Sequence, residues 1–372
     1  MTKEMMLKGY KKLTILHTES SKGWGGQEIR ILQEALGMRD RGYRVLIATE
    51  KDSILFQKAL AKNLEVFPIH FSKYNPLSFL KIKSLIEKEK VDILNTHSSK
   101  DSWIATIAAK IAYNKPKIIR TRHLSTPIKN NFNKLIYYLA DFIITTGQEI
   151  KNKMIERNKI NPEKILSIPT GVDLKKFDPQ RVVPAIKKQS DEIFIAMIGV
   201  LRSWKGHVYF LKAIPLVIKH VPQFRIKFFI VGDGPQKNNI IRCIEENNLN
   251  KNVSMLGHRE DIPEILASMD FIVHPSYANE GIPQVVIQAM AMKKPVIGTD
   301  VGSLKEVIIN EVTGFLIKPK NVEELSEKMI LLCNNKKMLS FLGENAMKFI
   351  EKDYSSEKMF EKLENLYEKL SS

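Results

Sequence analysis

The sequence predicts an α/β protein made of two doubly wound domains that face one another across a cleft. Short apolar runs suited to buried parallel strands alternate with amphipathic helical segments along most of the chain. This alternation stops at a connector, residues 179–190, and then begins again. The length of 372 residues is sufficient for two domains of ordinary size.

The expected strands are short runs of mostly apolar residues, each followed by a loop or a helix. In the first half they lie at residues 13–18, 44–49, 65–69, 91–97, 117–123, 141–146 and 164–168. In the second half they lie at residues 192–199, 224–232, 252–257, 270–274, 295–298 and 314–317. We therefore place a first domain at residues 1–180 and a second at 181–353, followed by an amphipathic helix within 354–372.

The composition excludes several classes of protein. With 44% hydrophobic and 27% charged residues, the chain is typical of soluble globular proteins. It contains no run of about 18 apolar residues, the length needed to span a membrane as a helix. Its two cysteines, Cys243 and Cys333, lack metal-ligand spacing, which favours a reduced, cytoplasmic setting.

Positive charge is concentrated in the first half of the chain. Residues 1–180 carry a net charge of +14, whereas residues 181–372 carry +3. This asymmetry favours an anionic partner, and the alternative is simply a lysine-rich surface. Basic helices near residues 77–90 and 129–139 favour an anionic membrane surface. No interleaving of aromatic and basic residues supports nucleic-acid binding, so we expect none.

The stretch from residue 270 to residue 302 is the strongest candidate for a binding site. An expected strand at 270–274 leads into a loop that contains Glu280, and Gly281 and Pro283 then open a helix. Ligands of parallel α/β sheets bind at the carboxyl ends of strands, and helix amino termini favour phosphate. The alternative is a loop that only connects two elements.

Other polar residues also follow expected strands. Arg202 and Lys205 lie three residues apart and are suited to hold a diphosphate. Gly232 and Gly234 form a turn that lets a ligand or a helix approach, and Arg259 could flank a nucleotide base. Each feature alone is also typical of a solvated surface, but together they line one edge of one sheet.

The first half has a similar edge. Gly25 and Gly26 follow the first expected strand, where their amides could approach a diphosphate or could serve only a tight turn. His97, Lys100, Asp101 and His123 also lie at or just past strand ends. We interpret them as a functional edge, although a single histidine in such a place is often structural.

These motifs resemble those of the retaining glycosyltransferases of family 4, which have the GT-B architecture of two Rossmann-like domains. The matching segments are Gly25–Gly26, PTGVDLKKFDP at 169–179, GVLRSWKG at 199–206, VGDGP at 231–235, LGHREDIPEILASMD at 256–270 and the stretch from His274 to residue 317. NTHSSKDSW at 95–103, together with RTRH, is similar to members that assemble bacterial lipopolysaccharide or surface polysaccharide.

The resemblance implies a division of labour between the domains. The second domain would bind a UDP- or GDP-sugar, and the first would bind a glycolipid or growing polysaccharide. The final helix would join the first domain. No cofactor or metal is expected, because cations would offset the charge of the leaving phosphate. We expect a cytoplasmic protein, peripheral on the inner face of the membrane.

The resemblance also implies roles for individual residues. The implied catalytic residues are Arg202, Lys205, Glu280 and His97. The implied donor-binding residues are Gly25, Gly26, Gly232, Gly234, Arg259, Gly281, Ile282, Pro283 and Gln288. Candidate acceptor contacts are Lys100, Asp101 and His123. No protein general base is required, because the donor phosphate would take the acceptor proton.

One position departs from the family pattern. The second acid of the E-x7-E motif falls on Gln288, whose amide oxygen can still accept a hydroxyl hydrogen bond but without charge assistance. We therefore expect weakened ribose binding. Gln288 also leaves open a scaffold protein that binds nucleotide sugars without turnover. A nucleotide-sugar epimerase or a disaccharide synthase would share the same architecture.

Overall fold

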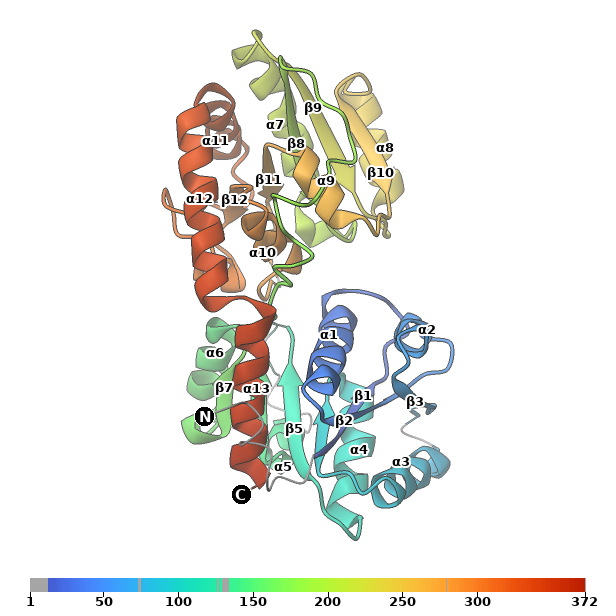
Figure 1. Ribbon diagram of the computed structural model, residues 1–372. Coiled ribbons are helices and arrows are strands. Elements are labelled where there is room, and N and C mark those ends of the chain that lie inside the picture. The colour runs from blue at the N-terminus through green and yellow to red at the C-terminus, as the bar shows by residue number, and fades with distance from the viewer. Residues whose placement is uncertain are drawn as a thin grey trace.

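The computed structural model describes residues 13–72, 75–124, 126, 128, 134–278 and 280–371. Two parallel sheets with helices on their faces form two Rossmann-like domains, which confirms the predicted fold class (Figure 1). Residues 168–191 connect the sheets. No helix within the described ranges is long and apolar enough to cross a membrane.

The first sheet has the strand order β3-β2-β1-β4-β5-β6-β7. All of its pairs are parallel, and Leu16 of β1 lies between Leu46 of β2 and Leu94 of β4. Buried aliphatic side chains on both faces account for the continuous apolar runs in the sequence. The strands are β1 (Thr14–Glu19), β2 (Arg44–Thr49), β3 (Glu65–Pro68), β4 (Ile93–Thr96), β5 (Lys117–Arg122), β6 (Phe142–Thr145) and β7 (Ile165–Ser167).

The helices of the first domain begin at residues suited to helix starts. Ser53 caps α2 through Phe56 N, and Asn75 caps α3 with Pro76 as its first residue. The helices are α1 (Gly26–Asp40), α2 (Ile54–Ala61), α3 (Pro76–Lys88), α4 (Ser99–Ile111), α5 (Leu135–Leu139) and α6 (Gln148–Asn158). Of the basic helix expected near 129–139, residues 129–133 lie outside the described residues.

The second sheet has the strand order β10-β9-β8-β11-β12-β13. Its strands are β8 (Glu192–Ile198), β9 (Arg225–Val231), β10 (Val253–Gly257), β11 (Phe271–His274), β12 (Val296–Thr299) and β13 (Gly314–Ile317). Its helices are α7 (His207–His220), α8 (Lys237–Glu246), α9 (Ile262–Ser268), α10 (Gln284–Ala291), α11 (Val322–Asn334) and α12 (Lys336–Asp353). Short 3-10 turns lie at η3 (Pro162–Lys164), η4 (Ser203–Lys205) and η5 (Gly302–Glu306).

The last helix, α13 (Ser356–Ser371), leaves the second domain and packs on the first (Figure 1). Its Tyr367 hydroxyl donates to Glu34 of α1 at 2.8 Å. The ring of Phe360 fills the space beside Gly37, where a Cβ would collide with it. The chain therefore passes between the domains twice, once before β8 and once after α12.

The two domains also contact one another directly. The Glu306 carboxylate of η5 accepts hydrogen bonds from Gln148 N and Glu149 N, each at 2.7 Å, at the amino terminus of α6. An acidic side chain is favoured there because helix amino termini present free N–H groups. Gln284 Nε2 of α10 donates to Gly26 O at 3.1 Å. These contacts bring the loops that follow β11 and β1 close to each other.

Candidate active site

The strand order explains why distant residues meet in the second domain. Chain connections leave neighbouring strands β8 and β11 in opposite directions, which makes their carboxyl ends a topological switch point. Lys205 follows β8, and Glu280 follows β11. The two loops are joined by a hydrogen bond from Tyr277 N to Trp204 O at 2.9 Å. The switch point therefore brings together two of the predicted catalytic residues.

Lys205, which is partly exposed, forms an ion pair with the buried Glu280, with 2.6 Å between Nζ and Oε1. Ser276 Oγ donates to the same carboxylate oxygen at 2.7 Å. The other oxygen, Oε2, has no partner among the described residues. Burial, the largest single effect, would raise the pKa of Glu280, but Lys205 and His274 together hold the pKa below its ordinary value. Glu280 is therefore a fixed anion with one oxygen left to accept a ligand hydroxyl.

Arg202 lies on the same loop as Lys205 and is accessible. It directly precedes η4 and is exposed, with its guanidinium over the Trp204 ring at 5.1 Å from the centroid. In the part of the chain that is described, it makes no ion pair. A guanidinium without a carboxylate partner can bind phosphate oxygens with two parallel hydrogen bonds.

A helix, α10, begins shortly after Glu280, as the sequence predicts. Pro283 precedes α10, and Ile282 is buried in the second-domain core. A Cβ on Gly281 would lie 3.1 Å from the main-chain oxygen of His123, so this loop lies against the first domain. Gln288, one turn further along, is partly exposed, and its side chain makes no hydrogen bond with the residues described.

Two predicted donor-binding glycines have a packing role. A Cβ on Gly232 would collide with Gly199 O, and one on Gly234 would lie 2.8 Å from Leu201 N. Both residues have positive φ, +138° and +155°, which favours glycine. The element that approaches this turn is therefore the loop after β8. Arg259 is paired with Asp261 through two hydrogen bonds, so it is not a free cation.

The first domain has its own switch point, between β1 and β4. His17 Nδ1 lies 2.9 Å from His97 Nε2, and His97 Nδ1 lies 3.0 Å from His123 Nε2. Burial, reinforced by neighbouring histidines and arginines, holds the pKa of His97 and the pKa of His123 well below the ordinary value. These neutral rings form a chain from the sheet interior toward the domain interface.

Both ring nitrogens of His97 are therefore occupied by other histidines. His97 is 2% exposed, whereas His123 is partly exposed and adjoins the Gly281 loop. The structure thus places His123 nearer than His97 to the junction of the domains. His97 remains at the position that was predicted from the sequence, but it lies behind His123.

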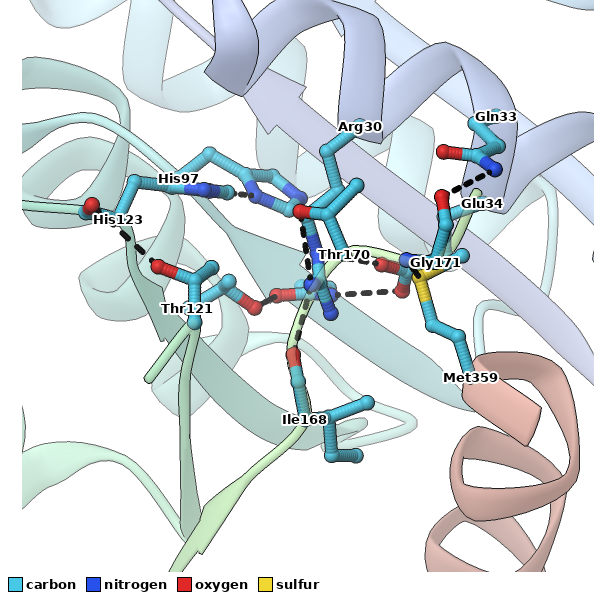
Figure 2. Close-up of polar contacts among 12 residues, drawn as sticks. Arg30, Gln33, Glu34, His97, Thr121, His123, Ile168, Thr170, Gly171 and Met359 are labelled. Carbon is cyan, nitrogen blue, oxygen red and sulfur yellow. Dashed lines mark hydrogen bonds and ion pairs between the residues drawn. The ribbon is translucent and has the colours of Figure 1, made fainter. Parts of the chain in front are cut away.

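Helix α1 connects these histidines to the segment that leads to the second domain. The Arg30 guanidinium donates to Ile168 O at 2.7 Å, and Gln33 donates to Gly171 O at 2.9 Å (Figure 2). Arg30 is fully buried and lies 3.5 Å from Glu34. Helix α1 thus holds the segment that connects the two domains.

Asp101 caps a helix rather than facing an open surface. Its carboxylate is fully buried and accepts hydrogen bonds from Thr18, Ser20, His97 N and Ser98 N. Burial, with a smaller effect of Glu19, raises the pKa of Asp101 to about 8. The structure therefore gives Asp101 a capping role in place of the predicted acceptor contact. Lys100, by contrast, is exposed on α4.

Gly25 and Gly26 lie at the start of α1, next to the second domain. Gly25 precedes the helix, and its N–H donates to Glu28 at 2.9 Å. A Cβ on Gly26 would meet nothing within 4 Å, so open space lies beside this residue. The predicted approach of a ligand to this turn is sterically possible at Gly26.

Three residues near Glu280 were not among the predicted site residues. His274 ends β11, and Ser276 lies on the loop that follows, with its Oγ 3.2 Å from His274 Nε2. His207 begins α7, and neither of its buried ring nitrogens has a hydrogen-bond partner among the residues that the structure describes. Burial, then Lys205, lowers the pKa of His207 to about 3. Their positions at strand or helix ends were the available signal in the sequence.

Comparisons with known proteins agree with this arrangement. The family model described as "Glycosyltransferase Family 4" matches residues 24–176, and the model "Glycosyl transferases group 1" matches residues 180–349. The chain is 30% identical, over 78% of each protein, to the Escherichia coli UDP-Gal:alpha-D-GlcNAc-diphosphoundecaprenol alpha-1,3-galactosyltransferase.

Solved structures show the same two-domain fold. A glycosyltransferase from Rickettsia africae superimposes with a TM-score of 0.87 and 25% identity, over 97% of this chain and 99% of that one. Anabaena HepE, solved in complex with UDP-glucose, superimposes with a TM-score of 0.80 and 21% identity, over 96% of this chain and 100% of that one.

Fold, site and comparisons together define an enzyme of the two-domain glycosyltransferase class. Within that class, the chain belongs to glycosyltransferase family 4. The predicted family and the predicted enzyme class are both confirmed.

Proposed function

We propose that this enzyme transfers a sugar, with retention of configuration, from a UDP- or GDP-sugar to a lipid-linked or polysaccharide acceptor in cell-envelope synthesis. The observation that carries the proposal is the arrangement of Arg202, Lys205 and Glu280 at the β8–β11 switch point. The name of the E. coli relative, which combines a UDP-sugar donor with a lipid-linked acceptor, supports both substrate classes.

The geometry suggests how the donor is held. Arg202 and Lys205 would contact the diphosphate, and Glu280 Oε2 would accept a hydrogen bond from a hydroxyl of the donor sugar. The acceptor oxygen would bond to the anomeric carbon on the face from which the phosphate oxygen departs. The acceptor proton would pass to that phosphate oxygen. Cations held in place before reaction would stabilise the negative charge on the leaving diphosphate, which requires no protein-bound metal.

Localisation is part of the same proposal. The net charge of +14 in residues 1–180 supports contact with an anionic membrane surface from the cytoplasmic side. Helix α3, with Lys81, Lys83 and Lys88, is one described segment that would contribute to that contact. Screening by salt should weaken such an attachment.

Titration of the purified protein with UDP, GDP and their sugar derivatives tests the proposed donor. One nucleotide should bind with a clear preference, and its sugar derivatives should be consumed when a lipid-linked acceptor is added. Binding without turnover over a broad acceptor panel would favour the scaffold alternative. Absence of binding by any of these nucleotides would contradict the proposed function.

Gln288 provides a second expectation from the same titration. Replacing Gln288 with glutamate should lower the Kd of the preferred nucleotide by about three- to tenfold, because charge-assisted hydrogen bonds are roughly twice as strong as neutral ones. Gln57→Glu, at an exposed position of α2, adds the same charge in the first domain and serves as the matched control. An unchanged Kd for Gln288→Glu would show that this side chain does not face the ribose.

A further inference from the structure

A cavity of about 240 Å³ lies between the two domains, next to α6. The first domain contributes basic residues and an apolar floor, and the second contributes Ala278, Val301 and Gly302. The lining on the side of the first domain includes Arg122, Leu124, Ile150, Lys153, Met154 and Arg157. None of them was singled out as a site residue by the sequence.

The cavity has an excess of positive charge. Lys153 is neutralised by an ion pair with Glu149. Arg157 is exposed and has no acidic partner among the described residues. Arg122 donates to Tyr137 Oη at 3.2 Å and to Thr126 O at 2.6 Å, which are both uncharged groups. Two guanidinium groups are thus left without a carboxylate, and guanidinium groups are well suited to bind phosphate oxygens.

The remainder of the lining is apolar. Ile150 and Met154 are each 2% exposed and pack into one buried cluster of the first domain. Leu124 is 52% exposed although its side chain is aliphatic. Pockets for whole drug-sized ligands have volumes of about 300–1,000 Å³, so this smaller cavity would admit the polar head of a larger molecule and leave its tail outside. Cations above an apolar wall match a diphosphate that is attached to a hydrocarbon chain.

The cavity also adjoins the loop that holds the donor sugar in the proposed function. Gly302 packs so closely on Glu280 O that a Cβ there would collide with it. A Cβ on Gly281 would lie 3.9 Å from Ile150 Cδ1 and 3.1 Å from His123 O. An acceptor whose head occupied the cavity would therefore lie beside the sugar that is to be transferred.

We propose that this cavity binds the diphosphate of a lipid-linked acceptor, with Arg122 and Arg157 on the phosphates and Leu124 beside the first part of the hydrocarbon chain. The inference rests on the proposed function, because it assigns the acceptor side of the same reaction. It makes Arg122 and Arg157 acceptor-binding residues and gives the excess of positive charge in the first domain a specific use.

Isothermal titration of the full-length protein with geranyl diphosphate tests this site. The protein is first saturated with its preferred nucleotide, so that the diphosphate site near Lys205 is filled. Geranyl diphosphate should bind at least about tenfold more tightly than inorganic pyrophosphate, because only the former also buries apolar surface. Geraniol, which lacks the diphosphate, should show no measurable binding.

Replacing Arg157 with glutamine should raise the Kd for geranyl diphosphate about tenfold, as expected for the loss of one charge-assisted hydrogen bond. Arg242→Gln, an exposed arginine on α8 of the second domain, is the matched control and should bind as the wild type does. Arg122→Gln should weaken binding similarly. Thermal unfolding of this variant would show whether the hydrogen bonds of Arg122 to Tyr137 and Thr126 are needed for folding.

Two results would overturn the proposal. Equal binding of pyrophosphate and geranyl diphosphate would indicate a site for a free anion rather than for a lipid-linked one. Unchanged binding in both arginine variants would place the ligand elsewhere. Neither result would affect nucleotide binding, so failure of this inference is distinguishable from failure of the proposed function, which would appear first as a lack of nucleotide binding.

Discussion

Replacing Lys205 with methionine is expected to slow glycosyl transfer by about 100- to 1,000-fold, the usual effect of removing one fixed group that stabilises developing negative charge. The same change leaves Glu280 buried without its cation. A buried charge that loses its partner typically costs about 3–5 kcal/mol of stability. A low rate in this variant alone would therefore not separate catalysis from folding.

The double variant Lys205→Met/Glu280→Gln separates the two effects. Removing both charges eliminates the unpaired carboxylate, so the free energy of unfolding should recover most of what the single variant loses. Transfer should stay low, because neither the diphosphate nor the sugar regains its partner. The measurements are urea unfolding and the initial rate of nucleotide release. A stable double variant with wild-type transfer would exclude the ion pair from the active site.

His207 is expected to cost the second domain about 2 kcal/mol of stability between pH 7.5 and pH 5. Burial lowers the pKa of His207 to about 3 and also lowers the pKa of His274. Below pH 6.5 the unfolded chain therefore binds protons that the folded chain does not, and stability falls as the pH falls. At pH 5 this amounts to about 2 kcal/mol for His207, and the lowered pKa of His274 adds a loss in the same direction. The pKa of Glu280, also lowered, adds a loss in the same direction below its ordinary value of 4.5.

A substitution at His207 checks this pH dependence. His207→Met keeps a side chain of similar size without a titrating group, so it should reduce the loss between pH 7.5 and pH 5 by about 2 kcal/mol. His220→Met, at the exposed end of the same helix, should leave the loss unchanged. Urea unfolding followed by Trp204 fluorescence, in a Trp24→Phe/Trp103→Phe background, reports on the second domain. Identical pH profiles for wild type and His207→Met would contradict the account.

The sequence predicted the fold well because strand periodicity is local. Residues 44–49 and 314–317 were expected as strands and are strands with those bounds. The meeting of Lys205 and Glu280 was also predictable in outline, since both follow strands of one parallel sheet. That they pair with each other was not predictable, because the distance between two side chains depends on the strand order.

The chemistry of the first domain was harder to predict. His17 and His97 are hydrogen-bonded although 80 residues separate them, and nothing in the local sequence marks His17 as a partner. Asp101 fits equally well as a helix cap and as an acceptor contact until its four hydrogen bonds are seen. The glycines of the Gly232 turn likewise indicate that another group packs closely against the backbone. The sequence alone does not say whether that group is a ligand or, as in the structure, the loop after β8.

The most direct test is a crystal structure of the enzyme with its preferred nucleoside-diphosphate sugar, in the hydrolysis-resistant phosphonate form. The account predicts phosphate oxygens within about 2.7–3.2 Å of the Arg202 guanidinium and Lys205 Nζ, and a sugar hydroxyl on Glu280 Oε2. A diphosphate bound away from both cations, with the Lys205–Glu280 pair facing no ligand, would contradict it.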